Sequence, residues 1–235
     1  MSDLNWNHSD IVPDAVDYWG EILQEIPYQR DITPEGDAVL VFGNPRGDSQ
    51  FVHLQGDNSL GLRGTCGLCS VEGVLNQYGI HVTEDDVVRY AAEYGLCTLT
   101  DNPLESGGSS PLDQARILTD FGVPAHAEMN LSLDDLASHV ESGQSVIIEC
   151  NVGMMFDNAD AVRNPYQYNH AIVVTGVARE AETGEILGLY VNDTGGFCTN
   201  EFGQVQGGTF VDARHVQAGW SNVGGHAVIP DAVRV

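Results

Sequence analysis

The sequence predicts an α+β fold, with helices in the first half of the chain packed on a mostly antiparallel sheet formed by the second half. Helical periodicity and capping residues mark a series of segments between residues 66 and 141. Apolar runs separated by turn residues mark short strands between residues 145 and 229. Helices and strands that are segregated along the chain are typical of the α+β class.

The expected helices share apolar residues at helical spacing and a capping residue or a proline at the start. They cover residues 66–78, 84–94, 110–121 and 133–141. Thr83 and Ser132 are the expected N-caps of two of them, and Pro111 suits a first helical position. Gly79 can adopt the left-handed conformation that ends the first of these helices.

The expected strands are short and rich in β-branched and other apolar residues. They cover residues 145–150, 171–177, 187–192, 209–211 and 226–229. Glu182, Thr183 and Gly184 form a plausible turn between the second and third of these strands. We therefore expect a hairpin in which the start of one strand lies beside the end of the next.

The length of 235 residues suits one domain with an extension. Residues 1–50 are predicted to be an N-terminal accessory segment, with a helix over residues 13–26 followed by a turn-rich stretch. Residues 51–235 are predicted to form the main domain. The sequence contains no internal repeat that would indicate a solenoid.

The charge is strongly negative: 34 acidic residues stand against 9 basic ones, all arginine, and the formal net charge is −25. A field of this sign repels nucleic acids and anionic lipids, so neither is an expected partner. The acidity fits a solvated surface suited to high salt. The absence of lysine fits equally a protein delivered into a foreign cytosol, where lysine-modifying enzymes would find no target.

The chain shows no targeting or membrane segment. No run reaches the roughly 18 apolar residues that a span requires, and the first residues carry acids instead of the basic and apolar regions of a signal peptide. We expect a cytoplasmic protein, or one delivered by a secretion route other than Sec. The odd count of 5 cysteines then favours free thiols over a disulfide framework.

The residues around Cys66 are typical of a nucleophile at the start of a helix. A thiol in the first helical turn faces the positive end of the helix dipole and free backbone N–H groups, which favours the thiolate. The same N–H groups can stabilise a developing oxyanion. Gly67 leaves room for an approaching substrate, and Cys69 is the competing nucleophile.

A thiolate nucleophile needs a base and a group that orients the base. His170 begins an apolar strand, and Asp193 ends the next strand of the predicted hairpin, so the two side chains should lie together. We expect Asp193 to orient His170, and His170 to exchange a proton with Cys66. His226, which also begins a short strand, is the competing base.

The stretch over residues 66–79 resembles the nucleophile helix of C39-type papain-like cysteine peptidases, which process bacteriocin leaders. It also resembles papain-fold domains of bacterial polymorphic toxins and effectors. Residues 169–176 resemble the histidine strand of this family, and Asp193 with Gly195 resembles its aspartate-containing strand end. The resemblance covers residues 55–200 and implies a papain-like (C39-like) fold, a catalytic triad of Cys66, His170 and Asp193, and no cofactor or metal.

One position departs from the family pattern. The family places a glutamine of the oxyanion hole about six residues before the cysteine, where this chain has Leu60. Gln55 is the replacement we expect, and Asn58 is a second candidate. The exporters to which leader-processing enzymes are fused have no counterpart here, so the resemblance does not imply leader processing.

We therefore expect a cysteine hydrolase that cleaves amide bonds of a peptide or protein through an acyl-enzyme. A glutamine deamidase or transglutaminase of the toxin or effector type, using the same triad, is the closest alternative, and an immunity or inhibitor protein would then be a further partner. Two alternatives belong to other functional classes: a redox or metal-binding role for the Cys66–Cys69 pair, and a binding module that catalyses no reaction. The sequence does not identify the substrate.

Overall fold

The computed structural model describes residues 27–158, 164–200 and 202–234. The helices are α1 (Pro45–Asp48), α2 (Cys66–Gln77), α3 (Glu84–Tyr94), α4 (Pro111–Asp120), α5 (Leu133–Glu141), α6 (Val152–Met155) and α7 (Ala213–Gly219). The strands are β1 (Tyr28–Ile32), β2 (Ala38–Gly43), β3 (Ala125–Glu128), β4 (Val146–Cys150), β5 (His170–Glu180), β6 (Ile186–Asn192), β7 (Thr209–Asp212) and β8 (His226–Pro230). The predicted α+β fold is confirmed.

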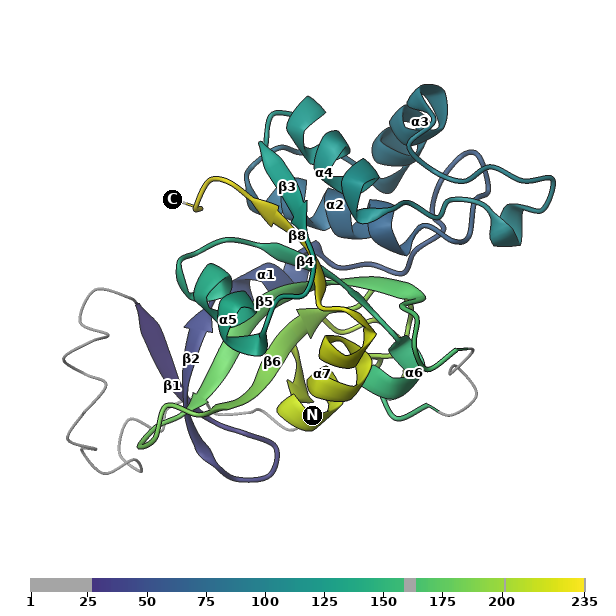
Figure 1. The fold of residues 1–235 in the computed structure, drawn as a ribbon. Coiled ribbons are helices and arrows are strands. Elements are labelled where there is room, and N and C mark those ends of the chain that lie inside the picture. The colour runs from purple at the N-terminus through teal and green to yellow at the C-terminus, as the bar shows by residue number, and fades with distance from the viewer. Residues whose placement is uncertain (1–26, 159–163, 201, 235) are drawn as a thin grey trace.

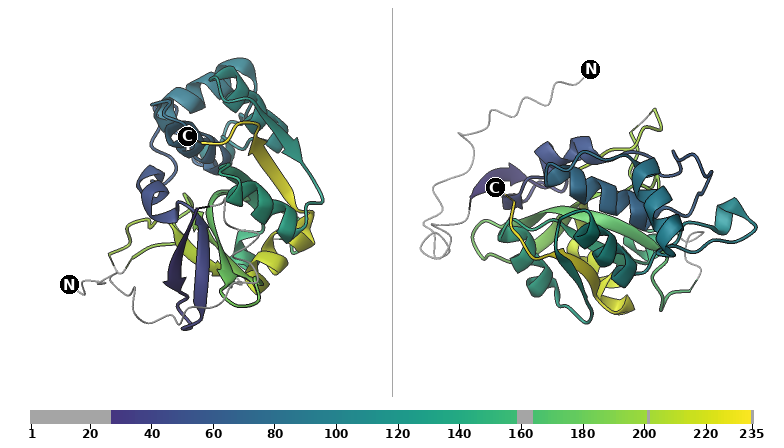
Figure 2. Two further views of the ribbon diagram at one scale, coloured as in Figure 1. Left: turned by 90° about the vertical axis from the view of Figure 1, so that its left-hand side faces the viewer. Right: turned by 90° about the horizontal axis from the view of Figure 1, so that it is seen from above.

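The described strands form one sheet in which neighbouring strands pair antiparallel. The order is β1-β2-β5-β4-β8-β3, and β6 branches from β5 and carries β7. Helices α2, α3 and α4 gather together beside β3, β4 and β8, whereas α5, α6 and α7 lie among the remaining strands (Figure 1). The views in Figure 2 show the same separation, with β1 and β2 at the end of the molecule away from α2–α4.

The helices start where the sequence places caps. Thr83, Ser110 and Ser132 each accept a hydrogen bond from the backbone N–H three residues on, and an aspartate at that third position bonds back in each case. Such capping boxes satisfy N–H groups that a helix leaves unpaired at its start. They therefore fix the first turns of α3, α4 and α5.

Strand alternation divides the core between the two faces of the central strands. Ile148 and Ile172 point to the face that is covered by α5 and α7, where Trp220 is fully buried. Ile147 and Val173, the neighbours in sequence, point to the opposite face, where α2 and α4 pack. Because β4 and β5 are covered on both faces, their sequences are nearly continuous apolar runs. Helix α2 packs against β5.

The structure adds elements that the sequence did not predict. Residues 28–43, expected to belong to an accessory segment, form β1 and β2, and β2 pairs with β5 of the main sheet. The short elements β3, α6 and α7 also lay outside the prediction. The helix predicted over residues 13–26 lies outside the described residues.

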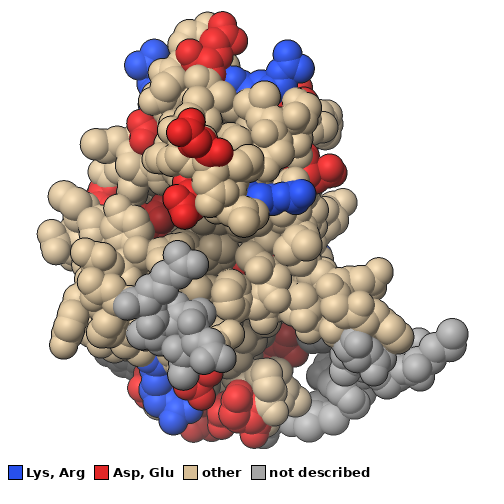
Figure 3. All heavy atoms as spheres, turned by 90° about the vertical axis from the view of Figure 1, so that its right-hand side faces the viewer, with Lys and Arg blue, Asp and Glu red and all other residues tan. Residues whose placement is uncertain are grey.

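On the face drawn in Figure 3, charged side chains lie mainly toward the upper and lower ends, and uncharged atoms cover most of the middle. The acidity of the chain is therefore not gathered into one patch on this face.

Within the described residues, the helices are all too short or too polar to cross a bilayer.

Candidate active site

The nucleophile candidate lies at the first residue of α2. Cys66 is half-buried, and Gly67 beside it is buried against Ser109 and Gln114. A Cβ atom at Gly67 would lie 2.4 Å from Ser109 Oγ and 2.5 Å from Gln114 Nε2. Glycine is therefore required here because these side chains pack directly against the start of the helix.

The start of α2 also differs from the other long helices in its cap. Thr65 occupies the N-cap position, but its side chain makes no capping hydrogen bond. The Thr65 hydroxyl instead donates to Glu84 Oε1 at 2.7 Å. The first N–H groups of α2 are consequently not capped by Thr65 and lie beside the Cys66 thiol, where an oxyanion could accept from them.

The hairpin of β5 and β6 brings His170 and Asp193 together. His170 Nε2 and Asp193 Oδ1 are 2.7 Å apart, and both side chains are buried. Asp193 also accepts hydrogen bonds from the backbone N–H groups of Gly195, Phe197 and Cys198. The carboxylate is thus fixed by four donors, and the imidazole is fixed by the carboxylate.

The neighbours of Asp193 separate its role from that of Asn192. Asn192 donates to the carbonyl of Asp48 and accepts from Gly208 N, away from His170. A Cβ atom at Gly195 would lie 2.7 Å from His170 Cε1, so this glycine leaves room for the imidazole ring. The turn after β6 therefore both orients His170 and accommodates it.

The protonation of His170 follows from its neighbours. Burial of the imidazole lowers its pKa, but the charge of Cys66 and hydrogen bonds with Asp193 and Cys66 outweigh this effect and raise the pKa of His170 to about 10. Burial alone would raise the pKa of Asp193, whereas the hydrogen bond and charge of His170 hold it below its usual range. These shifts favour an imidazolium at His170 beside an ionised Asp193.

Both oxyanion candidates lie in the segment before α2. Gln55 lies beside the turn that follows β6, because its backbone N–H donates to the carbonyl of Thr194 at 2.9 Å. Its side-chain amide donates to the carbonyl of Arg63, so only its second hydrogen could serve an oxyanion. Asn58 uses its amide to bond Leu62 O and Glu84 Oε1, which commits it to the loop.

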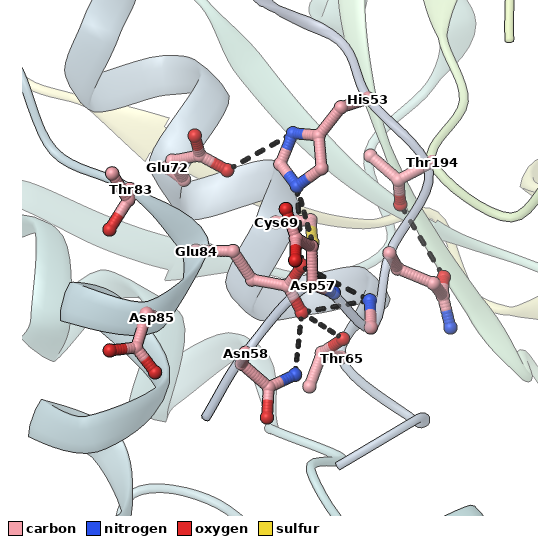
Figure 4. A network of polar contacts seen from close by, with 12 residues as sticks. His53, Asp57, Asn58, Thr65, Cys69, Glu72, Thr83, Glu84, Asp85 and Thr194 are labelled. Atoms are coloured by element: carbon pink, nitrogen blue, oxygen red, sulfur yellow. Dashed lines mark hydrogen bonds and ion pairs between the residues drawn. The ribbon is translucent and has the colours of Figure 1, made fainter. Parts of the chain in front are cut away.

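A second polar cluster lies on the side of α2 that faces α3, and we call it the Glu84 network (Figure 4). His53 lies between Glu72 and Glu84, with contacts of 3.4 Å and 3.2 Å, and Cys69 Sγ lies 3.8 Å from His53 Nε2. Among the described residues, His53, Cys69 and Glu72 also form a group whose ligand-type atoms lie within 4.8 Å of one another.

The contacts within the Glu84 network also shift the pKa values of its members. The hydrogen bond to Glu84 raises the pKa of His53. Burial and the nearby carboxylates raise the pKa of the Cys69 thiol far above its usual range. A protonated thiol is a poor nucleophile, so Cys69 does not match the reactive partner of a dithiol.

A buried carboxylate lies on the other side of the start of α2. Gln114 Nε2 donates to Glu149 Oε1 at 2.6 Å, and both side chains are buried. Burial raises the pKa of Glu149 to about 7. Sequence reasoning did not single out Glu149 or Glu84, because each meets its partners only through contacts between distant segments.

The competing residues occupy other places. Cys150 and Cys198 are buried, and burial raises the pKa of each thiol. The ring of His226 lies against that of Tyr168 in a tilted arrangement, with centroids 5.1 Å apart, and burial lowers the pKa of His226. Neither observation favours these groups as nucleophile or base.

Comparisons with known proteins identify the family of the chain. The model of a family described as the Peptidase_C39 like family matches residues 48–227. The chain belongs to the Peptidase_C39 like family. This membership supports a cysteine peptidase and gives the observed fold its name, C39-like and papain-like. A comparison with curated proteins gives no match.

Two solved structures are similar to the chain. One is described as a C39-like peptidase from Bacillus anthracis, with 16% sequence identity, a TM-score of 0.48, and coverage of 80% of this chain and 94% of that one. The other is a double glycine motif protease from an AMS/PCAT transporter, solved in complex with its leader peptide. It has 17% identity, a TM-score of 0.43, and coverage of 71% of this chain and 85% of that one.

Proposed function

We propose that the chain hydrolyses amide bonds of a peptide or protein substrate, with Cys66 as nucleophile, His170 as general acid and base, and Asp193 as the group that orients His170. The observation that carries the proposal is the buried 2.7 Å contact between His170 and Asp193, together with the interaction of the same imidazole with Cys66. Membership of a peptidase family supports the reaction class.

The reaction begins with attack of the Cys66 sulfur on the carbonyl carbon of the scissile amide. A C–S bond forms, and the carbonyl oxygen becomes an oxyanion that can accept from N–H groups at the start of α2. His170 uses Nε2 to bond Asp193, which leaves Nδ1 to exchange protons with Cys66 and the substrate. Collapse of the oxyanion breaks the C–N bond, and His170 gives its proton to the departing amine.

Hydrolysis of the thioester completes the cycle. His170, now neutral, takes a proton from water, and the resulting oxygen nucleophile attacks the acyl carbon. The C–S bond breaks, the carboxylic acid leaves, and the Cys66 thiolate and His170 imidazolium are restored. Asp193 holds one tautomer of His170 through both halves and does not need to accept its proton.

The test uses a complex mixture of peptides, with cleavage located by mass spectrometry. Wild-type protein should generate new termini, and Cys66→Ala should generate none while keeping the circular dichroism spectrum of the fold. Cys97→Ser is the matched control, because Cys97 is also half-buried but has no part in the proposed triad. Cleavage that survives in Cys66→Ala would contradict the assignment.

The same experiment separates hydrolysis from deamidation. Both reactions can use one acyl-enzyme and differ in the bond that breaks and in the acceptor of the acyl group. Glutamine deamidation adds about one dalton without new termini, and transglutamination joins two molecules with loss of ammonia. Either product, if it depends on Cys66, would replace peptide cleavage as the assigned reaction.

A further inference from the structure

Glu84, the first residue of α3, is an unusually well-bonded buried carboxylate. It is 2% exposed, and it accepts hydrogen bonds from Gly56 N at 2.9 Å, Asp57 N at 2.7 Å and Thr65 Oγ1 at 2.7 Å. Asn58 Nδ2 and His53 Nε2 complete its surroundings at 3.0 Å and 3.2 Å. Glu84 therefore ties the segment before α2 to the residue on which α2 begins.

The groups that Glu84 holds flank the candidate active site on both sides. Gly56 directly follows Gln55, the oxyanion candidate, and Thr65 directly precedes Cys66. Gln55 in turn bonds Thr194, the residue after Asp193. One carboxylate on α3 thus connects the Gln55–Gly56 segment with the residue that precedes the candidate nucleophile on α2.

The bond to Thr65 has a second consequence. A threonine at an N-cap position ordinarily uses its side-chain oxygen to accept from an N–H of the first turn. Here the Thr65 hydroxyl points its hydrogen at Glu84 and makes no capping bond. N–H groups at the start of α2 are then kept for the oxyanion of the substrate.

We propose that Glu84 is a positioning residue for the oxyanion site, which acts by fixing the Gln55–Gly56 segment and by holding Thr65 away from the N–H groups of α2. This inference rests on the proposed function. Five hydrogen-bond donors and the partial positive charge at the start of α3 keep the carboxylate ionised. Burial opposes this, but the bonds from His53, Thr65, Gly56 and Asn58 lower the pKa of Glu84 to about 2.

The neighbouring Asp85 supplies a matched control. It also lies in the first turn of α3 and also holds the loop before α2, since Asp85 Oδ1 accepts from Ser59 N at 2.7 Å and from Ser59 Oγ at 2.6 Å. Asp85 does not bond Thr65 or Gly56. A role in loop stability alone would therefore be shared by both carboxylates, whereas a role in the oxyanion site belongs to Glu84.

The experiment compares two reactions of Cys66 in Glu84→Gln and Asp85→Asn. Alkylation by iodoacetamide requires the thiolate but forms no oxyanion, whereas acylation by p-nitrophenyl acetate forms one. Loss of one oxyanion donor costs about 10²–10³ in rate, so its displacement should slow acylation in Glu84→Gln by about 10- to 100-fold. Alkylation should stay near the wild-type rate, and Asp85→Asn should leave both reactions near wild type.

Thr65→Val covers the case in which Glu84→Gln does not fold, because it removes only one of the five hydrogen-bond donors to Glu84. It should slow acylation and spare alkylation, and Thr65→Ser should restore acylation. Equal slowing of both reactions, equal effects of Glu84→Gln and Asp85→Asn, or no effect at all would overturn the role of Glu84. A wild-type Cys66 that reacts no faster than Cys97 would instead contradict the proposed function.

Discussion

Replacement of Asp193 by asparagine tests how the triad depends on one buried charge. Asp193 is fully buried, and its two oxygens serve separate donors: Oδ1 faces His170 Nε2 and Gly195 N, and Oδ2 faces Phe197 N and Cys198 N. The amide of asparagine must turn its NH2 group toward one of these pairs. If the NH2 group faces Phe197 and Cys198, both of their N–H groups lose their acceptor; if it faces His170, Gly195 N loses its acceptor and the imidazole must adopt the tautomer without a proton on Nε2.

The magnitudes follow from those four bonds. Each unsatisfied donor costs about 1–3 kcal/mol, so the loss of one or two of these bonds in Asp193→Asn should lower the free energy of unfolding by roughly 1–6 kcal/mol. Loss of a charge-assisted bond worth about 1.5–3 kcal/mol should lower the pKa of His170 by roughly one to two units. By comparison with the aspartate-to-asparagine change in serine proteases, kcat should fall by about 10²–10⁴-fold.

Three measurements on one variant check this prediction. Urea denaturation gives the stability, NMR titration of the histidine ring signals gives the pKa of His170, and turnover of an identified substrate gives kcat. Asp134→Asn, an exposed residue in the first turn of α5, is the control and should change none of them. An unchanged pKa of His170 together with an unchanged kcat would refute the reasoning.

Two further predictions concern residues around the site. Relative to wild type, Glu149→Gln should become more stable as the pH rises from about 4.5 to 7. Burial raises the pKa of Glu149 to about 7, so the folded wild type keeps a proton that the unfolded chain loses over this range. The stability of the wild type therefore falls between these pH values, and that of the variant does not. The gain above pH 7 should reach about 3 kcal/mol in chemical denaturation, with exposed Glu93→Gln as a flat control. In Gly195→Ala, the new Cβ atom would lie 2.7 Å from His170 Cε1 and should displace the ring, so turnover should fall more than the free energy of unfolding. Normal turnover in that variant would show that the ring has room to move.

Much of the fold could be predicted because its signals are local. Helices α2 to α5 carry apolar residues at helical spacing, and the N-caps expected at Thr83 and Ser132 form. Strands β4, β5 and β6 are apolar runs bounded by turns. Each of these elements can be recognised from its own short stretch of sequence.

The elements that were missed have weaker local signals. Gly36 and Gly43 adopt positive φ values of 101° and 87° at the ends of β2, so the turn-rich interpretation of this region was correct for its turns. The strands between those turns are only 5 and 6 residues long and gain their place by pairing with β5. Strand β3 has 4 residues, too few for a clear alternation.

The candidate site divides in the same way. His170 and Asp193 could be brought together from the sequence, because hairpin pairing fixes which strand ends are neighbours. The Glu84 network could not, because Glu84 meets His53 and Thr65 across separations of 31 and 19 residues, with no sheet register to relate them. Their catalytic roles remain predictions for the experiments above.

The most direct test of the central claim is the alkylation rate of Cys66 by iodoacetamide across pH 4 to 9, followed by peptide mass spectrometry in wild type and in His170→Ala. Cys97, which is also half-buried, serves as the internal reference. A thiolate–imidazolium pair predicts that Cys66 reacts far faster than Cys97 at about pH 5–6 and loses this advantage without His170. Reaction of both thiols in parallel, near the ordinary thiol pKa of about 8.5, would contradict an activated nucleophile at Cys66.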